Sequence, residues 1–506
     1  MPRQPNLLYI MCDQQRADTI AALGNPHIYT PNYDRLVKRG AAFTNAYTTC
    51  PVCVPARYTI RTGCEPPTTG VYQNGRPDLV EGQPETMERR CGPYLARTMA
   101  GRGYRTFGIG KFHSQPWDED LGYELHMHTE ELWGTAEHRS RDAYAGFIER
   151  EHPEFAFVEM LHGERTEMYY MPQMSPLPPE LTVEGFVATR AVEQIGRNDD
   201  DRPYFGFISF IGPHPPFAPP VPFNRMYDPD RMPNPVRGQR DVDLIDEQIR
   251  WMNYAIWAED INDPWARVLK ARYYGEISYI DHCLGRILDA VDAREDAGNT
   301  LICFYADHGD HHAWQKESYF EGACRVPFLV SWPDGVQAGP PRHDLVCLTD
   351  LFGIATAASG DCDARQGIDV LGMLDGSEPP RNHLAGYYGV PGTPRFKVMV
   401  RRGDWKYIFM ANGGYEQLFN LADDPDEIQQ QRDAHPDVAD ALRQLAVEAV
   451  RRANANRALD RDGALRRFPP TDRPPRRIHQ FCPSRGVRGF PDRPQDALQK
   501  EGLGQA

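Results

Sequence analysis

The sequence predicts an α/β fold in which a sheet is sandwiched between layers of helices. Short apolar runs alternate along the chain with longer amphipathic stretches, as in proteins that alternate strands and helices. The apolar runs are hydrophobic at nearly every position, which is typical of strands covered on both faces. With 506 residues, 41% of them hydrophobic and 11% aromatic, the chain suits one large domain with appendages, or two domains.

The elements follow from these patterns in chain order. The predicted strands of the sheet are Leu7–Met11, Tyr104–Ile109, Tyr204–Phe210, Thr300–Tyr305 and Val326–Trp332. The predicted helices, from apolar residues at helical spacing, are Gly92–Ala100, Val183–Ile195, Trp265–Val291 and Asp350–Ala358. From about Arg381 the pattern changes to short antiparallel strands, which are predicted at Phe396–Arg401, Trp405–Phe409 and Gln417–Leu421. A tight turn at residues 402–404 joins the first two, and one helix is predicted at Pro436–Asn454.

We therefore expect a main domain over residues 1–380, an antiparallel sheet with a helix over 381–460, and a Pro- and Arg-rich tail over 461–506. Residues 451–506 carry 13 Lys and Arg against 6 Asp and Glu, although the whole chain has a formal net charge of -15. This tail is expected to wrap its own domain or to reach an acidic neighbouring subunit of a homo-oligomer. A mobile tail is the alternative, and the sequence leaves it open.

Composition excludes several classes of partner. A net charge of -15 argues against nucleic acid, whose phosphates require a cationic face. No segment is apolar over the length needed to span a bilayer, and the run Leu7–Met11 is too short for a signal-peptide core, so the sequence predicts a cytoplasmic protein away from membranes. The eleven cysteines are scattered and lack zinc spacing apart from Cys50–Cys53, so reduced thiols are expected.

Polar side chains follow four of the predicted strands. Asp13-Gln14 follows the first, Lys111 and His113 the second, His214 the third, and Asp307-His308 the fourth. Ligands bind beyond the carboxyl ends of strands in open α/β sheets, so these residues are expected to share one site.

Several of these residues have the chemistry of a metal site. Asp13, Gln14, Asp307 and His308 would offer carboxylate, amide and imidazole ligands to one divalent cation. One imidazole with oxygen donors favours Ca²⁺ or Mn²⁺ over zinc. The alternative is that each Asp is only a helix cap or turn former.

Cationic and titratable residues complete the candidate site. Lys111 and Lys316 can neutralise an anionic ester oxygen, and His113 can exchange a proton near neutral pH. His214 lies among three prolines that restrict its backbone, which suits a donor to a leaving group. The alternatives are a solvated loop for Lys111 and His113, a structural turn for His214 and a surface lysine for Lys316.

Cys53 opens the most specific motif, Cys53-Val54-Pro55-Ala56-Arg57 followed by Thr62-Gly63. Thiol chemistry by itself does not need a proline and an arginine at fixed positions downstream. The alternative is a buried cysteine before a helix that starts at Pro55.

The chain resembles the type I sulfatases of the alkaline-phosphatase-like superfamily, in register from Asn6 to about Asp424. The matching segments are residues 30–36, the Cys53 motif, and residues 103–106, 110–113, 213–217, 306–309 and 405–407. The resemblance implies an alkaline-phosphatase-like sandwich, with a large mixed, mostly parallel sheet between helices and a smaller C-terminal antiparallel sheet. It also implies a hydrolase of small-molecule sulfate esters.

The resemblance further implies a role for each site residue. Cys53 would be oxidised to formylglycine by a formylglycine-generating enzyme and would act as nucleophile and metal ligand, and Arg57 would orient its diol. The implied metal ligands are Asp13, Gln14, Cys53, Asp307 and His308. The residues that would bind the ester and move protons are Lys111, His113, His214 and Lys316.

Two departures point toward a neighbouring activity. Many sulfatases have Asp-Asp and Asp-Asn at the metal positions, whereas the pairs Asp13-Gln14 and Asp307-His308 resemble phosphonate monoester hydrolases and choline sulfatases. Asn74 matches a substrate-contacting Asn of the phosphonate hydrolases, which in turn lack the pair Lys111 and His113. We therefore expect a sulfatase, with a phosphonate monoester or phosphodiester hydrolase as the alternative. A catalytically silent binding protein, in which Cys53 stays unmodified, is the other alternative.

Overall fold

Eight strands form the central sheet, in the order β4-β3-β5-β1-β6-β7-β2-β8. The computed structural model describes residues 4–74, 87–130, 136–155, 172, 174–236, 262–310 and 316–471. The strands are β1 (Asn6–Cys12), β2 (Ala41–Tyr47), β3 (Arg105–Gly110), β4 (Leu125–His128), β5 (Tyr204–Ser209), β6 (Thr300–Ala306), β7 (Phe328–Ser331) and β8 (Arg342–Cys347). Only β7 runs antiparallel to its neighbours β6 and β2. The sheet is therefore mixed and mostly parallel, which confirms the predicted fold class.

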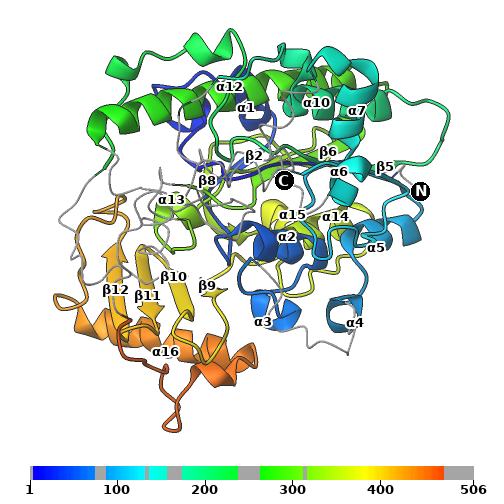
Figure 1. The fold of residues 1–506 in the computed structure, drawn as a ribbon. Coiled ribbons are helices and arrows are strands. Elements are labelled where there is room, and N and C mark those ends of the chain that lie inside the picture. Colours follow the sequence, from blue (N-terminus) through cyan, green and yellow to red (C-terminus); the bar gives the residue numbers. More distant parts are fainter. Residues whose placement is uncertain are drawn as a thin grey trace, which may run out of the picture.

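Helices cover both faces of this sheet (Figure 1). Leu8 and Ile10 of β1 pack into one hydrophobic cluster, whereas Leu7 and Tyr9 pack into the cluster on the other face. The first cluster contains residues of α1 (Pro31–Lys38), α7 (Ala143–Glu151), α10 (Val183–Ile195) and α12 (Asp263–Asp292). The second contains residues of α2 (Cys53–Thr62), α4 (Met87–Cys91), α5 (Leu95–Gly101), α14 (Asp350–Ala358) and α15 (Val370–Asp375). Burial on both faces explains the continuous hydrophobicity of the central strands.

The predicted elements are present in the structure, with one helix starting later than predicted and four strands unpredicted. The predicted helix Gly92–Ala100 begins later, at Leu95, because Gly92 has φ +81° and separates α4 from α5. Strands β2, β4, β8 and β9 were not predicted. The edge strands β4 and β8 are only partly buried and are rich in polar residues, so neither reads as an apolar run.

A second, four-stranded antiparallel sheet has the order β12-β11-β10-β9. Its elements are β9 (His383–Tyr388), β10 (Lys397–Arg402), β11 (Trp405–Met410), β12 (Tyr415–Asn420) and the covering helix α16 (Pro436–Arg452). Gly403 has φ +56° in the turn that joins β10 to β11, as predicted for residues 402–404. Most of the Pro- and Arg-rich tail, residues 472–506, lies outside the described residues, so its expected role in oligomer contacts stays a prediction.

The second sheet packs against the segment that carries Cys53. Cys50 and Val52 share a hydrophobic cluster with residues of β9 to β12, and the backbone N–H of Tyr387 donates to the carbonyl of Thr49 at 2.8 Å. A buried ion cluster also joins the second sheet to a helix of the main domain. It consists of Lys406 of β11 with Glu321 of α13 (Glu321–Cys324) at 2.9 Å and Glu427 at 2.5 Å, and we call it the buried triad. In the described part of the chain, no helix combines the length and the apolar character that crossing a membrane requires.

Candidate active site

Four parallel strands deliver the predicted polar residues to one edge of the sheet. β3, β5, β1 and β6 are consecutive neighbours, and they are followed by Lys111, His214, Asp13 and Asp307. The backbone N–H of Asp307 donates to the carbonyl of Cys12, which holds the ends of β1 and β6 together. Because the strands are parallel, their carboxyl ends meet at the same edge. The predicted convergence of these four chain segments is therefore observed.

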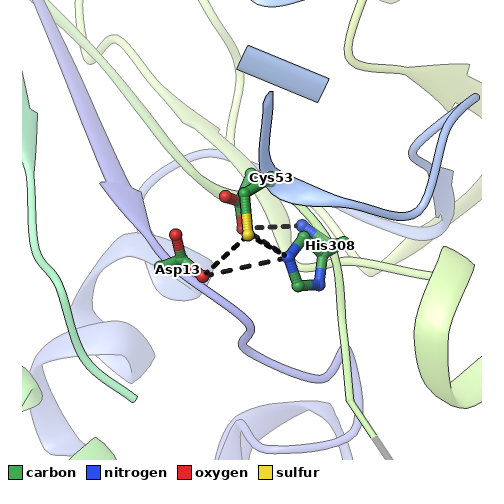
Figure 2. A group of neighbouring side chains, drawn as sticks. Asp13, Cys53 and His308 are labelled. Atoms are coloured by element: carbon green, nitrogen blue, oxygen red, sulfur yellow. Dashed lines mark hydrogen bonds and ion pairs between the residues drawn. The ribbon is translucent and has the colours of Figure 1, made fainter. Parts of the chain in front are cut away.

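Cys53 is the first residue of α2 and is fully buried. Its Sγ lies 3.1 Å from Nε2 of His308 and 3.8 Å from Oδ1 of Asp13, and the three side chains point toward one another (Figure 2). The helix therefore begins at Cys53 itself, two residues before Pro55. The alternative interpretation, a buried cysteine in front of the helix, had placed the start at Pro55. Asn74 supports this start, because its Oδ1 accepts a hydrogen bond from the backbone N–H of Val54 at 3.1 Å.

Asp13, Cys53, Asp307 and His308 form a compact group of potential metal ligands. One ligand atom from each residue lies within 4.8 Å of the others, and all four residues are buried. Nδ1 of His308 lies 2.7 Å from the carbonyl of Gly309, which directs Nε2 toward the group. Two carboxylates and one imidazole are a donor set that suits a hard or borderline divalent cation. Four of the five predicted metal ligands therefore converge.

Gln14, the fifth predicted ligand, makes other contacts with its side chain. Its Oε1 accepts a hydrogen bond from Nζ of Lys316 at 2.7 Å, and its Nε2 donates to Oδ2 of Asp310 at 2.7 Å. Its backbone has φ +64° and donates to Oδ1 of Asp307 at 3.0 Å. The amide of Gln14 thus connects the metal group to Lys316. Asp310 was not selected from the sequence, although it lies only three residues after Asp307.

Arg57 holds the two carboxylates of the group in place. Its Nη2 donates to Oδ2 of Asp13 at 2.8 Å, and its Nε donates to Oδ2 of Asp307 at 3.2 Å. Its Nη1 donates to Oγ of Ser209, the last residue of β5, at 3.1 Å. Arg57 lies one helical turn after Cys53, so the motif spacing places the guanidinium beneath the group. In the unmodified protein, Arg57 orients carboxylates, whereas its predicted role toward a diol stays a prediction.

Burial and neighbouring charges give the two carboxyl groups different pKa values. Burial alone would raise both. Lys111 and Arg57 nevertheless hold the pKa of Asp13 well below its usual range, and Nζ of Lys111 is only 2.7 Å from Oδ2 of Asp13. Burial together with the negative charge of Asp13 raises the pKa of Asp307 to about 6.

The imidazole and the thiol of the group are also shifted. Burial opposes the charged form of His308, but the adjacent Asp307 and Cys53 raise its pKa to about 9. Burial also opposes ionisation of Cys53, yet Lys316 and His308 bring the pKa of its thiol well below the usual value. In the unmodified group, these shifts favour a thiolate on Cys53 beside an imidazolium on His308. A divalent cation would take the place of the imidazolium proton.

Three of the predicted ester-binding residues, Lys111, Lys316 and His214, lie beside this group. Nζ of Lys316 lies 3.3 Å from Nε2 of His214, whose Nδ1 is 2.9 Å from the carbonyl of Pro215. His113 follows Lys111 in a turn with φ +49° rather than in an extended strand, and its backbone N–H donates to Oε1 of Glu130. Glu130 was missed in the sequence because no pattern separates it from other acidic residues.

Comparisons with known proteins agree with this geometry. A family model described as Sulfatase matches residues 5–357. The chain is 26% identical over 443 residues to an arylsulfatase of Clostridium perfringens (strain 13 / Type A). This match covers 84% of this chain and 89% of that protein. It is 28% identical over 454 residues to a choline-sulfatase of Rhizobium meliloti (strain 1021), with 84% and 82% covered.

A solved structure gives the same fold. The phosphonate monoester hydrolase of Agrobacterium radiobacter is similar with a TM-score of 0.72 and 22% sequence identity. The match covers 92% of this chain and all of that chain. At this level of identity, the similarity supports the fold but does not identify the substrate, which has to be inferred from the chemistry of the site.

Proposed function

Because the chain belongs to the sulfatase family, we propose that it hydrolyses small-molecule sulfate monoesters with a formylglycine made from Cys53 and one divalent cation. The observation that carries this proposal is the position of Cys53. It is the first, buried residue of α2, lies within 3.8 Å of His308 and Asp13, and has Arg57 one turn further along the helix. A formylglycine-generating enzyme would be the partner that oxidises it.

The donor set fits the cation that the family implies. Asp13, Asp307 and His308 would hold Ca²⁺ or Mn²⁺ together with residue 53, and the backbone N–H of Gln14 donates to Oδ1 of Asp307 beside them. When bound, the cation supplies Lewis-acid activation of the ester and of the nucleophile. Arg57 keeps both carboxylates oriented for it.

The surrounding side chains have the chemistry that sulfate transfer needs. Lys111 and Lys316 would bind the terminal oxygens of the ester, and His214 or Lys316 would give a proton to the leaving alcohol. A hydrated formylglycine has two hydroxyl groups, one to attack sulfur and one to help expel sulfate by C–O cleavage. His113 would accept the proton of the second hydroxyl, so that sulfate leaves and the aldehyde is restored.

Two measurements test the proposal. Mass spectrometry of the tryptic peptide that contains residue 53 should show the loss of the thiol and the presence of the aldehyde or its hydrate. The same preparation should hydrolyse an aryl or alkyl sulfate. Full activity with an unmodified thiol at residue 53 would contradict the mechanism. A protein that stays unmodified and inactive when it is produced together with a formylglycine-generating enzyme would instead favour the alternative of a catalytically silent binding protein.

A phosphonate monoester or phosphodiester hydrolase is the second candidate. Asn74 favours it, because its amide lies at the start of α2 beside residue 53, where it could contact a substrate. The pairs Asp13-Gln14 and Asp307-His308 favour it as well. Lys111 favours the sulfatase, since its buried ammonium lies in the site. The ratio of kcat/KM values for a sulfate monoester and a phosphonate monoester distinguishes the two candidates.

A further inference from the structure

Glu130 is a buried carboxylate beside the candidate active site. It lies two residues after β4 and is only 3% exposed. Its Oε1 accepts the backbone N–H of His113 and lies 2.7 Å from Nε2 of His128. An internal carboxylate of this kind needs partners to stay buried, and here the partners include the turn that carries His113.

The position of Glu130 is itself fixed by the helix layer. Its backbone N–H donates to Oδ2 of Asp142 at 2.9 Å, and Oγ1 of Thr129 donates to Oδ1 of the same residue at 3.0 Å. Asp142 is the N-cap of α7 and accepts the backbone N–H of Ala145 at 2.9 Å. A continuous set of hydrogen bonds therefore runs from α7 to the turn at His113.

The conformation of His113 depends on such support. Its φ of +49° lies in the left-handed region, which a residue with a side chain adopts only where surrounding contacts hold it. Nδ1 of its ring is buried and has no hydrogen-bond partner among the residues that the structure describes. The imidazole therefore lacks a hydrogen bond at Nδ1 that would hold the ring, and the carboxylate of Glu130 accepts the N–H of the turn from which the imidazole extends.

Cationic and imidazole groups surround this carboxylate. Burial opposes its ionisation, but His128, His113 and Lys111 lower the pKa of Glu130 to about 2. His126 and Arg57 also interact with its charge. These neighbours therefore favour the anionic form of Glu130.

We propose that Glu130 is a positioning residue that acts through His113 in the release of sulfate. This inference rests on the proposed function, in which His113 accepts a proton from residue 53. Glu130 holds the turn and thereby the imidazole, while His113 makes the contact with the reacting group. Asp142, at the start of α7, thereby contributes to the release of sulfate, because it fixes the backbone of Glu130.

Substitutions at Glu130 separate its acceptor oxygen from its charge. Glu130→Ala removes both, and we expect kcat to fall about 10- to 100-fold, as for a misplaced catalytic group, with KM within about twofold. The sulfated form of residue 53 should accumulate in the mass spectrum. Glu130→Gln keeps an acceptor oxygen and should retain most of the kcat. Glu124→Gln is the matched control, because Glu124 is a half-exposed partner of Arg202 before the same strand.

A double-mutant cycle distinguishes positioning from a general structural role. In a His113→Ala background, Glu130→Ala should change kcat by less than about twofold, because the residue through which it acts is gone. The same loss in both backgrounds, or an unchanged kcat in Glu130→Ala, would overturn the inference. Thermal unfolding of each variant identifies any loss of folded protein. A wild type that cleaves only phosphonate monoesters would contradict the proposed function, and the cycle would then be run on that substrate.

Discussion

Replacing Lys111 by Met tests how much one buried ammonium contributes to the reaction. Nζ of Lys111 is fully buried and lies 2.7 Å from Oδ2 of Asp13, to which Arg57 also donates at 2.8 Å. Methionine keeps most of the length of the side chain and removes its charge. The substitution therefore probes the charge with little change in packing.

The structure allows the two effects of this change to be separated. If Lys111 binds the ester, its loss removes one preorganised charged contact to the transition state, worth about 2.7–4 kcal/mol, or about 10²- to 10³-fold in kcat/KM. Folding should suffer less than the ~3–5 kcal/mol that an orphaned buried charge costs, because Asp13 keeps its pair with Arg57. We therefore expect a large kinetic effect with a smaller loss of stability.

Steady-state kinetics on a chromogenic aryl sulfate measure the first effect, and urea unfolding measures the second. Lys38→Met, at the exposed end of α1, is the control and should change neither. The reasoning would be refuted if Lys111→Met has the urea midpoint of the wild type and keeps kcat/KM within about threefold of it. In that case the ammonium only neutralises Asp13. The residue pairs Asp13-Gln14 and Asp307-His308, which resemble those of phosphonate monoester hydrolases, would then be the better guide to the substrate class.

Three further outcomes are expected. If the proposed mechanism holds, Cys53→Ala should abolish turnover, because it removes the nucleophile, and should leave the urea midpoint nearly unchanged, because the sheet does not depend on the sulfur. In the unmodified protein, the raised pKa values of His308 (about 9) and Asp307 (about 6) mean that a cation must displace protons. The affinity for Mn²⁺ measured by calorimetry should therefore rise with pH up to about 9 and fall most steeply below about 6, and a pH-independent affinity would exclude His308 as a ligand. Lys406→Met should lower the free energy of unfolding by at most ~3–5 kcal/mol, since it leaves Glu427 of the buried triad without the Lys406 ammonium, while Glu321 keeps its ion pair with Arg325 at 3.3 Å. A change below about 1 kcal/mol in urea unfolding would show that Glu427 is protonated instead.

The central strands were predictable for a physical reason. β1, β5 and β6 are covered on both faces, so their residues must be apolar at nearly every position, and the sequence displays this directly. The edge strands β4 and β8 expose part of their length and need no such pattern. A polar residue after each buried strand was equally visible, and parallel pairing alone brings such residues together.

By itself, the sequence determined the α/β class, the motif that makes Cys53 the candidate nucleophile and the strand ends that supply Asp13, Lys111, His214 and Asp307. These depend on local composition and on motif spacing within one helix or strand. Only the tertiary structure decided that Gln14 contacts Lys316 and Asp310, and that Glu130 supports the turn at His113. Such contacts join side chains from separate elements, and their partners are set by packing in three dimensions rather than by any spacing along the chain.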